Sequence, residues 1–218
     1  MTDASTTAMR RQPRQNRSEQ RIGLILDSLA ALIDEVGYSN LSIAMIAKRA
    51  DMSGPGIYRY FDDLNAIARA LATRNLERLL AVTAMRLDEA GESWEQGLAG
   101  AIDAYAGLFR TEPGFRWLRL GDSVDSNLMN AEESNRTVVA RVTGTLFVER
   151  YEVGYRDDLL AHIEVIVEII DALTARAFAT DPAGDPFFLS EVTRITTGYL
   201  DDYLARSLAG SGDVIPLT

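Results

Sequence analysis

Apolar residues recur at helical spacing along most of the 218-residue chain. The first apolar stripe begins after Asn16 and Glu19, which are spaced as a capping box, and it continues until Gly37, a residue type that commonly ends a helix. A second, shorter stripe follows Ser42, and Ser53 is placed to cap a third helix. The pattern therefore predicts three helices between residues 16 and 61.

The second and third predicted helices lie on either side of a short turn, which is the layout of a helix-turn-helix. The third helix opens on Gly54–Gly56, where the missing N–H of a proline costs little and where small residues let the backbone approach a phosphate. Ile57 and Phe61 are spaced to face the inside of this unit. The residues left to point outward or sideways are Tyr58, Arg59 and Tyr60. DNA is therefore the first partner to consider for this segment.

The rest of the chain is also helical in pattern. Breaks at Gly91, Pro113 and residues 181–186 separate further predicted helices over residues 64–90, 93–110, 132–153, 157–179 and 187–208. The helix over 157–179 is apolar on more than one side, so it needs two neighbours. We therefore predict an all-α fold, in which an N-terminal three-helix helix-turn-helix domain precedes a larger helical bundle.

Charge is distributed unevenly between these two parts. Residues 1–61 hold eight Lys and Arg against six Asp and Glu, for +2, and residues 62–218 hold fourteen against twenty-six, for −12, which together give −10. A chain this acidic does not attract nucleic acid through its general field, so DNA contact requires a locally basic face. An N-terminal arginine segment could follow phosphates or enter the minor groove, or it could be a disordered solubilising tail; its residues are Arg10, Arg11, Arg14 and Arg17.

Composition narrows the other possibilities. At 47% hydrophobic residues the chain can bury a substantial core in one or two domains. It has no cysteine, which excludes disulfides and thiolate metal sites. No N-terminal leader and no apolar run long enough to span a bilayer occur in it, so we expect a soluble cytoplasmic protein that does not bind membranes.

An enzyme is a rival class, because three pairs of adjacent aspartates could share Mg²⁺ ions: Asp62 and Asp63, Asp157 and Asp158, and Asp201 and Asp202. No carboxylate follows any pair at one helical turn, and positions at predicted helix starts favour capping for at least two pairs. His162, the only histidine, has no nucleophile motif to serve, and no glycine-rich phosphate loop or His-Glu-x-x-His motif occurs. We therefore predict no catalytic residue, no metal and no cofactor.

The segment from Gly37 to Phe61 follows a pattern of fixed spacing. A glycine and an aromatic residue end the first helix, Ile-Ala-x-x-Ala forms the second, and Ser-x-x-x-Ile-Tyr-x-Tyr-Phe follows; the matching residues are Gly37, Tyr38, Ile46, Ala47, Ala50, Ser53, Ile57, Tyr58, Tyr60 and Phe61. With this pattern, residues 1–67 resemble the DNA-binding domain of the TetR family of bacterial transcriptional regulators. The chain departs from the family at Leu64, where a lysine is usual, and at Gly54, where a hydrogen-bonding side chain often follows the capping serine.

The resemblance implies an organisation for the whole chain. It implies a flexible basic arm over residues 1–15, a helix-turn-helix DNA-binding domain over 16–63, and a helical ligand-binding and dimerisation domain over 64–218. In the family, the second element of the helix-turn-helix lies in the major groove, the central helices hold a small-molecule pocket, and the last two helices pair with a second subunit. The implied partners are a palindromic double-stranded DNA operator, a small-molecule effector and a second copy of the chain.

Three sets of candidate site residues follow. Those for DNA are Arg14, Arg17, Ser42, Ser53, Gly54, Pro55, Gly56, Tyr58, Arg59 and Tyr60. Those for the ligand are Tyr105, Phe109, Phe115, Trp117, Met129, Phe147 and His162. Those for the dimer interface are Ile163, Ile166, Ile170, Val192, Ile195, Tyr199 and Tyr203. For the last two sets, ordinary core within one chain is the alternative.

The sequence thus favours a homodimeric, sequence-specific transcriptional regulator, and specifically a repressor released by a small hydrophobic ligand. Gly54 and Leu64 keep open a second interpretation, a helical interaction module that has lost DNA binding. A helical-bundle enzyme is the third.

Overall fold

The computed structural model describes residues 12–117, 135–151 and 158–210 of the chain, with side chains from residue 17 to residue 206 of these ranges. The described segments fold into α-helices joined by turns and contain no strand. The α-helices are α1 (Gln12–Val36), α2 (Ile43–Arg49), α3 (Gly54–Ile57), α4 (Leu64–Glu89), α5 (Trp94–Thr111), α7 (Asn135–Tyr151), α8 (Leu159–Ala177) and α9 (Pro186–Gly210), and a 3-10 turn, η1, spans Tyr38–Asn40. The predicted all-α fold is confirmed.

Two hydrophobic cores divide the described residues. We call residues 12–71 the head: its core joins α1, α2 and α3 to the first turns of α4, and its fully buried members include Ile25, Leu29, Ile46, Ile57 and Leu71. The other described residues form the body, where α4 packs on α5 and α7, and α8 packs on α7 and α9. Because Leu71 is in the head core, this core extends beyond residue 63, where we expected the head to end.

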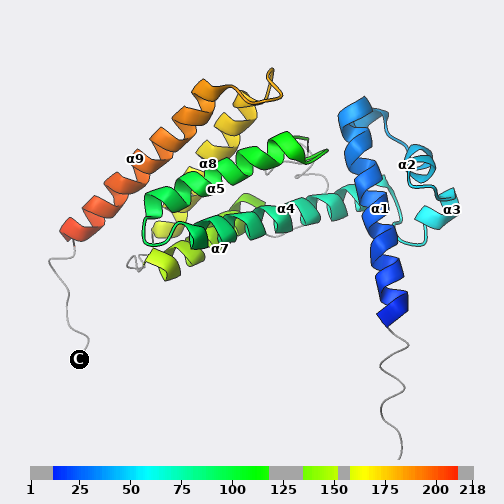
Figure 1. Ribbon diagram of the computed structural model, residues 1–218, viewed down its shortest axis with the longest axis horizontal. Helices are drawn as coiled ribbons and strands as arrows, with labels where there is room; N and C mark the ends of the chain where they lie inside the picture. Colours follow the sequence, from blue (N-terminus) through cyan, green and yellow to red (C-terminus); the bar gives the residue numbers. More distant parts are fainter. Residues whose placement is uncertain (1–11, 118–134, 152–157, 211–218) are drawn as a thin grey trace, which may run out of the picture.

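Helix α4 connects the two cores as one continuous element (Figure 1). Its N-terminal part contributes Ile67 and Leu71 to the head, and its later turns contribute Leu79 to the core of the body. A continuous helix transmits rotation and translation without a flexible linker. The position of the head is therefore coupled to the packing of α4 in the body.

The predicted ends of the head helices agree with the structure at most positions. Gly37 ends α1 with a φ of 76°, a value that L side chains rarely adopt. Ser42 and Ser53 cap α2 and α3, each accepting a hydrogen bond from a backbone N–H three residues later. Helix α1, however, begins at Gln12, before the capping box expected at Asn16, so its first turn includes part of the segment expected to be a flexible arm.

The acidic pairs have different environments. Asp63 caps α4 by accepting a hydrogen bond of 2.6 Å from the N–H of Ala66, as expected. Asp158 is the N-cap residue of α8, at a helix start as expected, but its side chain makes no capping hydrogen bond. Asp202 lies inside α9. Asp157 lies outside the described residues. Within the described ranges, no three His, Asp or Glu side chains gather as a metal site would require.

Candidate DNA-binding surface and effector cavity

Helix α3 is a single turn that presents backbone more than side chain. The Ser53 hydroxyl accepts a hydrogen bond of 3.2 Å from the N–H of Gly56, and Pro55 occupies the first turn, where its missing N–H is not needed. A Cβ atom added to Gly54 would meet no other atom within 4 Å. The N-terminal end of α3 therefore offers open space in which a DNA backbone could come close to the peptide chain.

Two long side chains project just after α3. Tyr58 is 56% exposed, and Arg59 is exposed and makes no ion pair or hydrogen bond within the described residues. Tyr60, which we expected to point outward or sideways, is half-buried and packs against the core of the head. Tyr58 and Arg59 are thus free to contact an external partner, whereas Tyr60 is partly committed to packing.

Helix α2 contributes a second part of this surface. Ser42 is exposed, and its hydroxyl accepts a hydrogen bond of 3.4 Å from the N–H of Met45. At the other end of α2, Arg49 forms an ion pair of 2.7 Å with Glu35 of α1, and Lys48 is exposed. The ion pair fixes α2 against α1 and removes Arg49 from the set of freely available cations.

The turn between α2 and α3 has a feature that the sequence pattern did not reveal. Asp51 has a φ of 52°, in the left-handed region that favours glycine. Its N–H donates to the carbonyl of Lys48, and the N–H of Met52 donates to the carbonyl of Ala47, an arrangement that ends α2 and reverses the chain. The turn that sets the angle between α2 and α3 therefore depends on a strained non-glycine residue.

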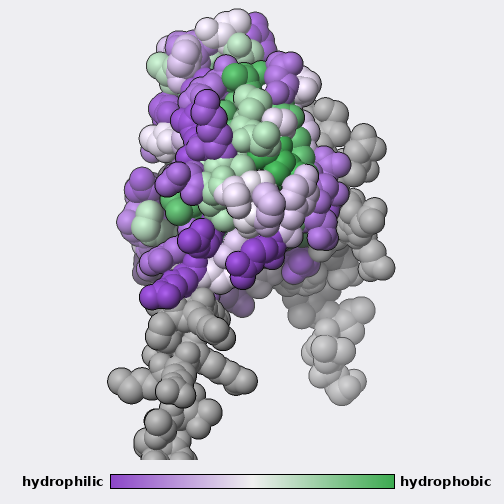
Figure 2. Space-filling model, turned by 90° about the vertical axis from the view of Figure 1, so that its right-hand side faces the viewer, coloured by the Kyte–Doolittle hydropathy of each residue, from purple (hydrophilic) through white to green (hydrophobic). Residues whose placement is uncertain are grey.

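The remaining DNA candidates lie on α1. Arg17 is exposed on α1; Arg14 lies in the same helix, but its side chain is outside the described part. Leu64, at the position where the TetR resemblance predicts a lysine, packs against the core of the head. The face of the molecule that carries α2 and α3 has an apolar area bordered by hydrophilic residues (Figure 2). Polar and charged groups therefore surround, and do not cover, the middle of this face.

A cavity of about 90 Å³ lies in the body, among α4, α5, α7, α8 and α9. Its wall carries no charged side chain from the described residues, and only three of its members have polar groups. The lining residues are Leu79, Thr83, Leu87, Leu98, Ala101, Tyr105, Val139, Thr143, Phe147, Ile163, Ile166, Val167, Ile170 and Leu200. An apolar ligand is the chemistry that such a wall favours.

The structure places two of the seven ligand candidates, Tyr105 and Phe147, in the wall of this cavity. Phe115 is buried beside Phe109 in an aromatic cluster of the core, and Phe109 also faces a surface groove between the head and the body. Trp117 stacks on the ring of Tyr38, away from the cavity. Met129 lies outside the described residues. Helical periodicity identified apolar faces, but it did not distinguish a cavity wall from a filled core.

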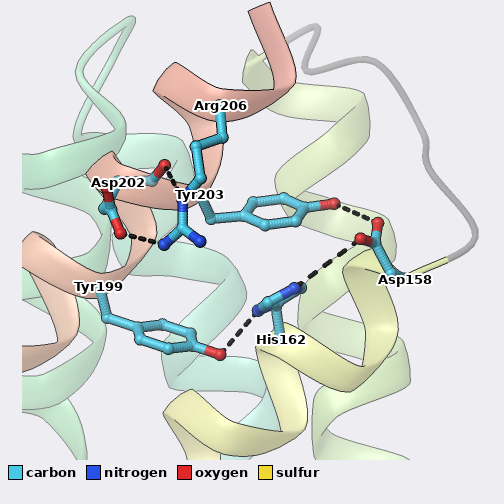
Figure 3. A network of polar contacts seen from close by, with 6 residues as sticks. All are labelled: Asp158, His162, Tyr199, Asp202, Tyr203 and Arg206. Atoms are coloured by element: carbon cyan, nitrogen blue, oxygen red, sulfur yellow. Dashed lines mark hydrogen bonds and ion pairs between the residues drawn. The ribbon is translucent and has the colours of Figure 1, made fainter. Parts of the chain in front are cut away.

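His162 joins α8 to α9 (Figure 3). It does not line the cavity. Its Nδ1 atom lies 2.6 Å from the hydroxyl of Tyr199, and its Nε2 atom lies 3.8 Å from a carboxylate oxygen of Asp158. The hydroxyl of Tyr203 donates to the same carboxylate at 2.9 Å, and Arg206 is paired with Asp202 one turn away. These contacts connect the start of α8 to the last turns of α9, which is a structural role.

The expected dimer residues separate into two groups. Ile163 and Ile166 line the cavity, and Val192 and Tyr203 are buried in the core of the same chain, so these four have too little exposed surface to contact a second chain. This placement corrects their expected role, because the side of α8 that carries Ile163 and Ile166 packs into the core of its own subunit. The half-buried residues of the set are Ile170, Ile195 and Tyr199, of which Ile170 also lines the cavity.

The charged side chain of Asp171 is buried close to the cavity. Asp171 is 1% exposed; it accepts a hydrogen bond of 2.7 Å from the hydroxyl of Tyr105 and forms an ion pair of 2.9 Å with Arg136. Burial lowers the pKa of Arg136, but the hydrogen bond and charge of Asp171 outweigh it, so this pKa lies above its ordinary value and the guanidinium stays charged. The carboxylate is therefore compensated within the protein and is not left for a ligand.

The head and the body also touch directly where the chain leaves α5. The N–H of Gly114, after α5, donates to the carboxylate of Asp34 in α1 at 3.0 Å. Gly114 has a φ of 71°, and a Cβ atom there would lie 3.0 Å from the Cα of Ala30, so only glycine fits between the two segments. The segment that follows α5 therefore forms a second connection between head and body, in addition to α4.

Two family models match the chain in the order of these parts. Residues 25–71 match the model for bacterial regulatory proteins of the tetR family, and residues 92–204 match the Tetracyclin repressor-like C-terminal domain. The chain belongs to the TetR family. It is a helix-turn-helix transcriptional regulator, as the sequence indicated. Regulators of this family bind operator DNA and small-molecule effectors, act as dimers, and are not enzymes.

Individual relatives agree with this assignment to the TetR family. A TetR-family transcriptional regulator of known structure from Streptomyces coelicolor is 34% identical, with a TM-score of 0.69 over 84% of this chain and 98% of that one. The HTH-type transcriptional regulator BetI of Proteus mirabilis is 26% identical over 81% of this chain and 88% of its own length. The uncharacterized regulator YobS of Bacillus subtilis is 32% identical over 44% of this chain, a match that spans about half of YobS, 51%.

No helix among the described residues of this TetR-family chain has both the length and the apolar character that crossing a membrane requires.

Proposed function

We propose that this chain is a homodimeric repressor that binds a palindromic operator through α2 and α3 and is released from it by a small apolar effector in the body. The observation that carries the proposal is the path of α4, which packs into the core of the head and also forms a wall of the cavity. A change in the shape of the cavity is therefore transmitted to the DNA-binding surface through this one helix.

On the DNA side, we assign docking to the exposed end of α3. The N-terminus of α3, with the open position at Gly54, approaches a phosphate, and Tyr58 and Arg59 contact the backbone beside it. Ser42 serves the same purpose at the start of α2, and Arg17 extends the contact along α1. Because Gly54–Gly56 offers few groups for base readout, sequence choice rests on Arg59, the arginines near the N-terminus and the distance between the two heads.

On the body side, the effector acts by differential affinity. A ligand shifts an equilibrium only if it binds one arrangement better than the other. Leu79, Thr83 and Leu87 of α4 line the cavity, so a ligand that enlarges the cavity displaces α4 relative to α5 and α7. Displacement of α4 moves the head that is packed on its first turns, and the spacing of two heads in a dimer then no longer matches the operator.

For the dimer, we propose the outer faces of α8 and α9. These helices pack against each other along their length, and Val165 on α8 is 41% exposed although it is apolar. Ile195 and Tyr199 on α9 are half-buried and remain partly available. Sedimentation of the purified chain should give the mass of two copies, and Val165→Glu should shift it toward one copy; a monomeric wild-type chain would contradict the dimer.

The test of the function itself is selection of genomic DNA fragments by the purified chain. Enrichment of a palindromic sequence supports the proposal, whereas no enrichment favours an interaction module that has lost DNA binding. On the selected site, the double substitution Tyr58→Ala with Arg59→Ala should weaken binding to all sequences and reduce its salt dependence, because phosphate contacts release counterions. Arg206, an exposed residue at the far end of α9, provides the control: Arg206→Ala should leave the affinity for DNA and its salt dependence unchanged.

A further inference from the structure

The three polar groups in the cavity wall differ in what they bind. Tyr105 donates its hydroxyl to the buried carboxylate of Asp171 at 2.7 Å. Thr143 donates its hydroxyl to the carbonyl of Val139, one turn earlier, at 2.7 Å. Thr83 is 6% exposed, and its hydroxyl has no hydrogen-bond partner anywhere in the part of the chain that the structure describes.

A threonine inside a helix can bond its hydroxyl to a carbonyl of its own helix. Thr73, Thr143 and Thr196 all donate to the carbonyl four residues earlier. A buried polar group without a partner costs free energy unless a ligand or water supplies the missing bond. Thr174 also lacks a partner, but it does not line the cavity. Among the residues that the structure describes, only Thr83 therefore combines an unused hydroxyl with a position in the cavity wall.

The remainder of the wall restricts what can pair with this hydroxyl. Every other lining group is aliphatic, aromatic or already bonded within the protein, and the nearby carboxylate of Asp171 is compensated by Arg136. A charged ligand would lose its hydration without gaining an opposite charge, which is strongly unfavourable. A neutral ligand loses much less hydration free energy when it enters the cavity.

We propose that Thr83 is the polar anchor of the effector cavity, and that the effector is an uncharged, mainly apolar molecule with one hydroxyl or carbonyl group that bonds to the Thr83 hydroxyl. This inference rests on the proposed function in one respect, that the cavity holds the effector. The size of the cavity sets the scale of the ligand: it is about 90 Å³. A dry engineered cavity of about 150 Å³ accepts benzene, so a single small ring fits here after modest movement of side chains.

Phenol and toluene test the anchor directly, because they differ mainly in a hydroxyl that replaces a methyl group. Calorimetric titration of the full chain at pH 7 should show phenol binding more tightly than toluene by about 2- to 12-fold, the ratio that one net hydrogen bond supplies. Benzoate, which has the same ring and a negative charge, should not bind measurably.

Substitutions at two threonines then locate the effect. Thr83→Val keeps the shape and removes the hydroxyl, so phenol should fall to the affinity of toluene, while Thr83→Ser should retain the preference. Thr143→Val is the matched control, because the Thr143 hydroxyl already donates within its own helix, and it should leave the ratio of phenol to toluene unchanged. Thermal unfolding of each variant verifies that the fold is intact.

Equal binding of phenol and toluene, a preference that survives Thr83→Val, comparable binding of benzoate, or no binding of either neutral probe would each overturn the inference. Operator binding without any probe is measured in parallel. If the wild-type chain binds no operator but still binds phenol more tightly than toluene, the regulator function is overturned and the anchor is not. Normal operator binding without binding of either probe would overturn the anchor alone.

Discussion

The ring of Tyr38 stacks on the ring of Trp117, with centroids 4.1 Å apart and planes inclined by 23°. Tyr38 follows α1 in the head, and Trp117 follows α5 in the body. The hydroxyl of Tyr38 also donates to the side chain of Asn65 at the start of α4, at 2.7 Å. One aromatic residue thus contacts both connections between head and body, the long helix α4 and the segment after α5.

The stack predicts a stability effect that extends to both parts of the molecule. Trp117→Ala removes an aromatic pair at a half-buried position, and it should lower the free energy of unfolding by about 1–3 kcal/mol. Urea denaturation of the full chain measures this loss. Tyr38→Phe is the control, because it keeps the stacked ring and removes only the bond to Asn65, at a cost of about 0.5–1.5 kcal/mol. If Trp117→Ala costs no more than Tyr38→Phe, the stack does not hold head and body together.

Local signals in the sequence predicted the helix ends of the head, but they did not predict its long-range contacts. Ser42, Ser53 and Gly37 mark helix ends through bonds and backbone angles formed within a few residues, so their roles can be read from neighbours in the chain. The contact of Tyr38 with Trp117 joins residues far apart in the sequence, and no local pattern specifies it.

The body shows the same limit in another form. Ile163 and Ile166 repeat at helical spacing, which correctly predicts that they face apolar surroundings. Periodicity does not state whether those surroundings are the same chain, a second chain or a cavity. The sequence could not predict that the Thr83 hydroxyl is unused. Whether this hydroxyl forms a hydrogen bond depends on the rotation of one side chain inside α4.

The turn of the helix-turn-helix predicts a stabilising substitution. Asp51 has a φ of 52°, where a Cβ atom is strained and glycine is not. Asp51→Gly should therefore raise the free energy of unfolding by about 0.5–1 kcal/mol, the strain relieved exceeding the added freedom of the unfolded chain. Chemical denaturation provides the measurement.

Asp51→Ala separates strain from charge. It removes the same carboxylate but keeps the Cβ atom, so the strain at this φ remains. We expect it not to stabilise the protein. Equal stabilisation by glycine and alanine would mean that the charge, and not the backbone, is the cause.

The open position at the start of α3 predicts a gain of DNA affinity. A Cβ atom at Gly54 meets no other atom within 4 Å, so Gly54→Lys introduces a cation at an open position of the head. If this position faces the DNA backbone, binding should tighten at low salt, and the slope of log affinity against log salt should steepen by about 0.9, the effect of one more neutralised phosphate. Fluorescence anisotropy at several salt concentrations measures both. Gly54→Ala adds the Cβ atom without charge and should leave the slope unchanged; an unaltered slope in the lysine variant as well would place Gly54 away from DNA.

The position of Tyr38 at the junction also predicts how stability responds to alkali. Burial raises the pKa of the Tyr38 hydroxyl above its ordinary value of about 10, and the negative charge of Asp63 raises it further, against an opposing effect of Arg69. Above about pH 10 the unfolded chain therefore loses this proton before the folded chain does. The stabilisation linked to the raised pKa of Tyr38 is fully present below about pH 10, and it is lost as the pH rises through the folded-state pKa.

Tyr38→Phe removes this ionisation and should make the loss of stability between about pH 9.5 and 11 shallower than in the wild-type chain. Urea denaturation across this range gives the two slopes. Burial also raises the pKa of Tyr151, so Tyr151→Phe should reduce the remaining slope further, and the two effects should add because the residues lie in different cores. Below about pH 9 all these curves should run parallel, because neither hydroxyl titrates there. A wild-type slope retained in Tyr38→Phe would mean that the hydroxyl is as well solvated in the folded chain as in the unfolded one, and that the junction with Trp117 opens to water.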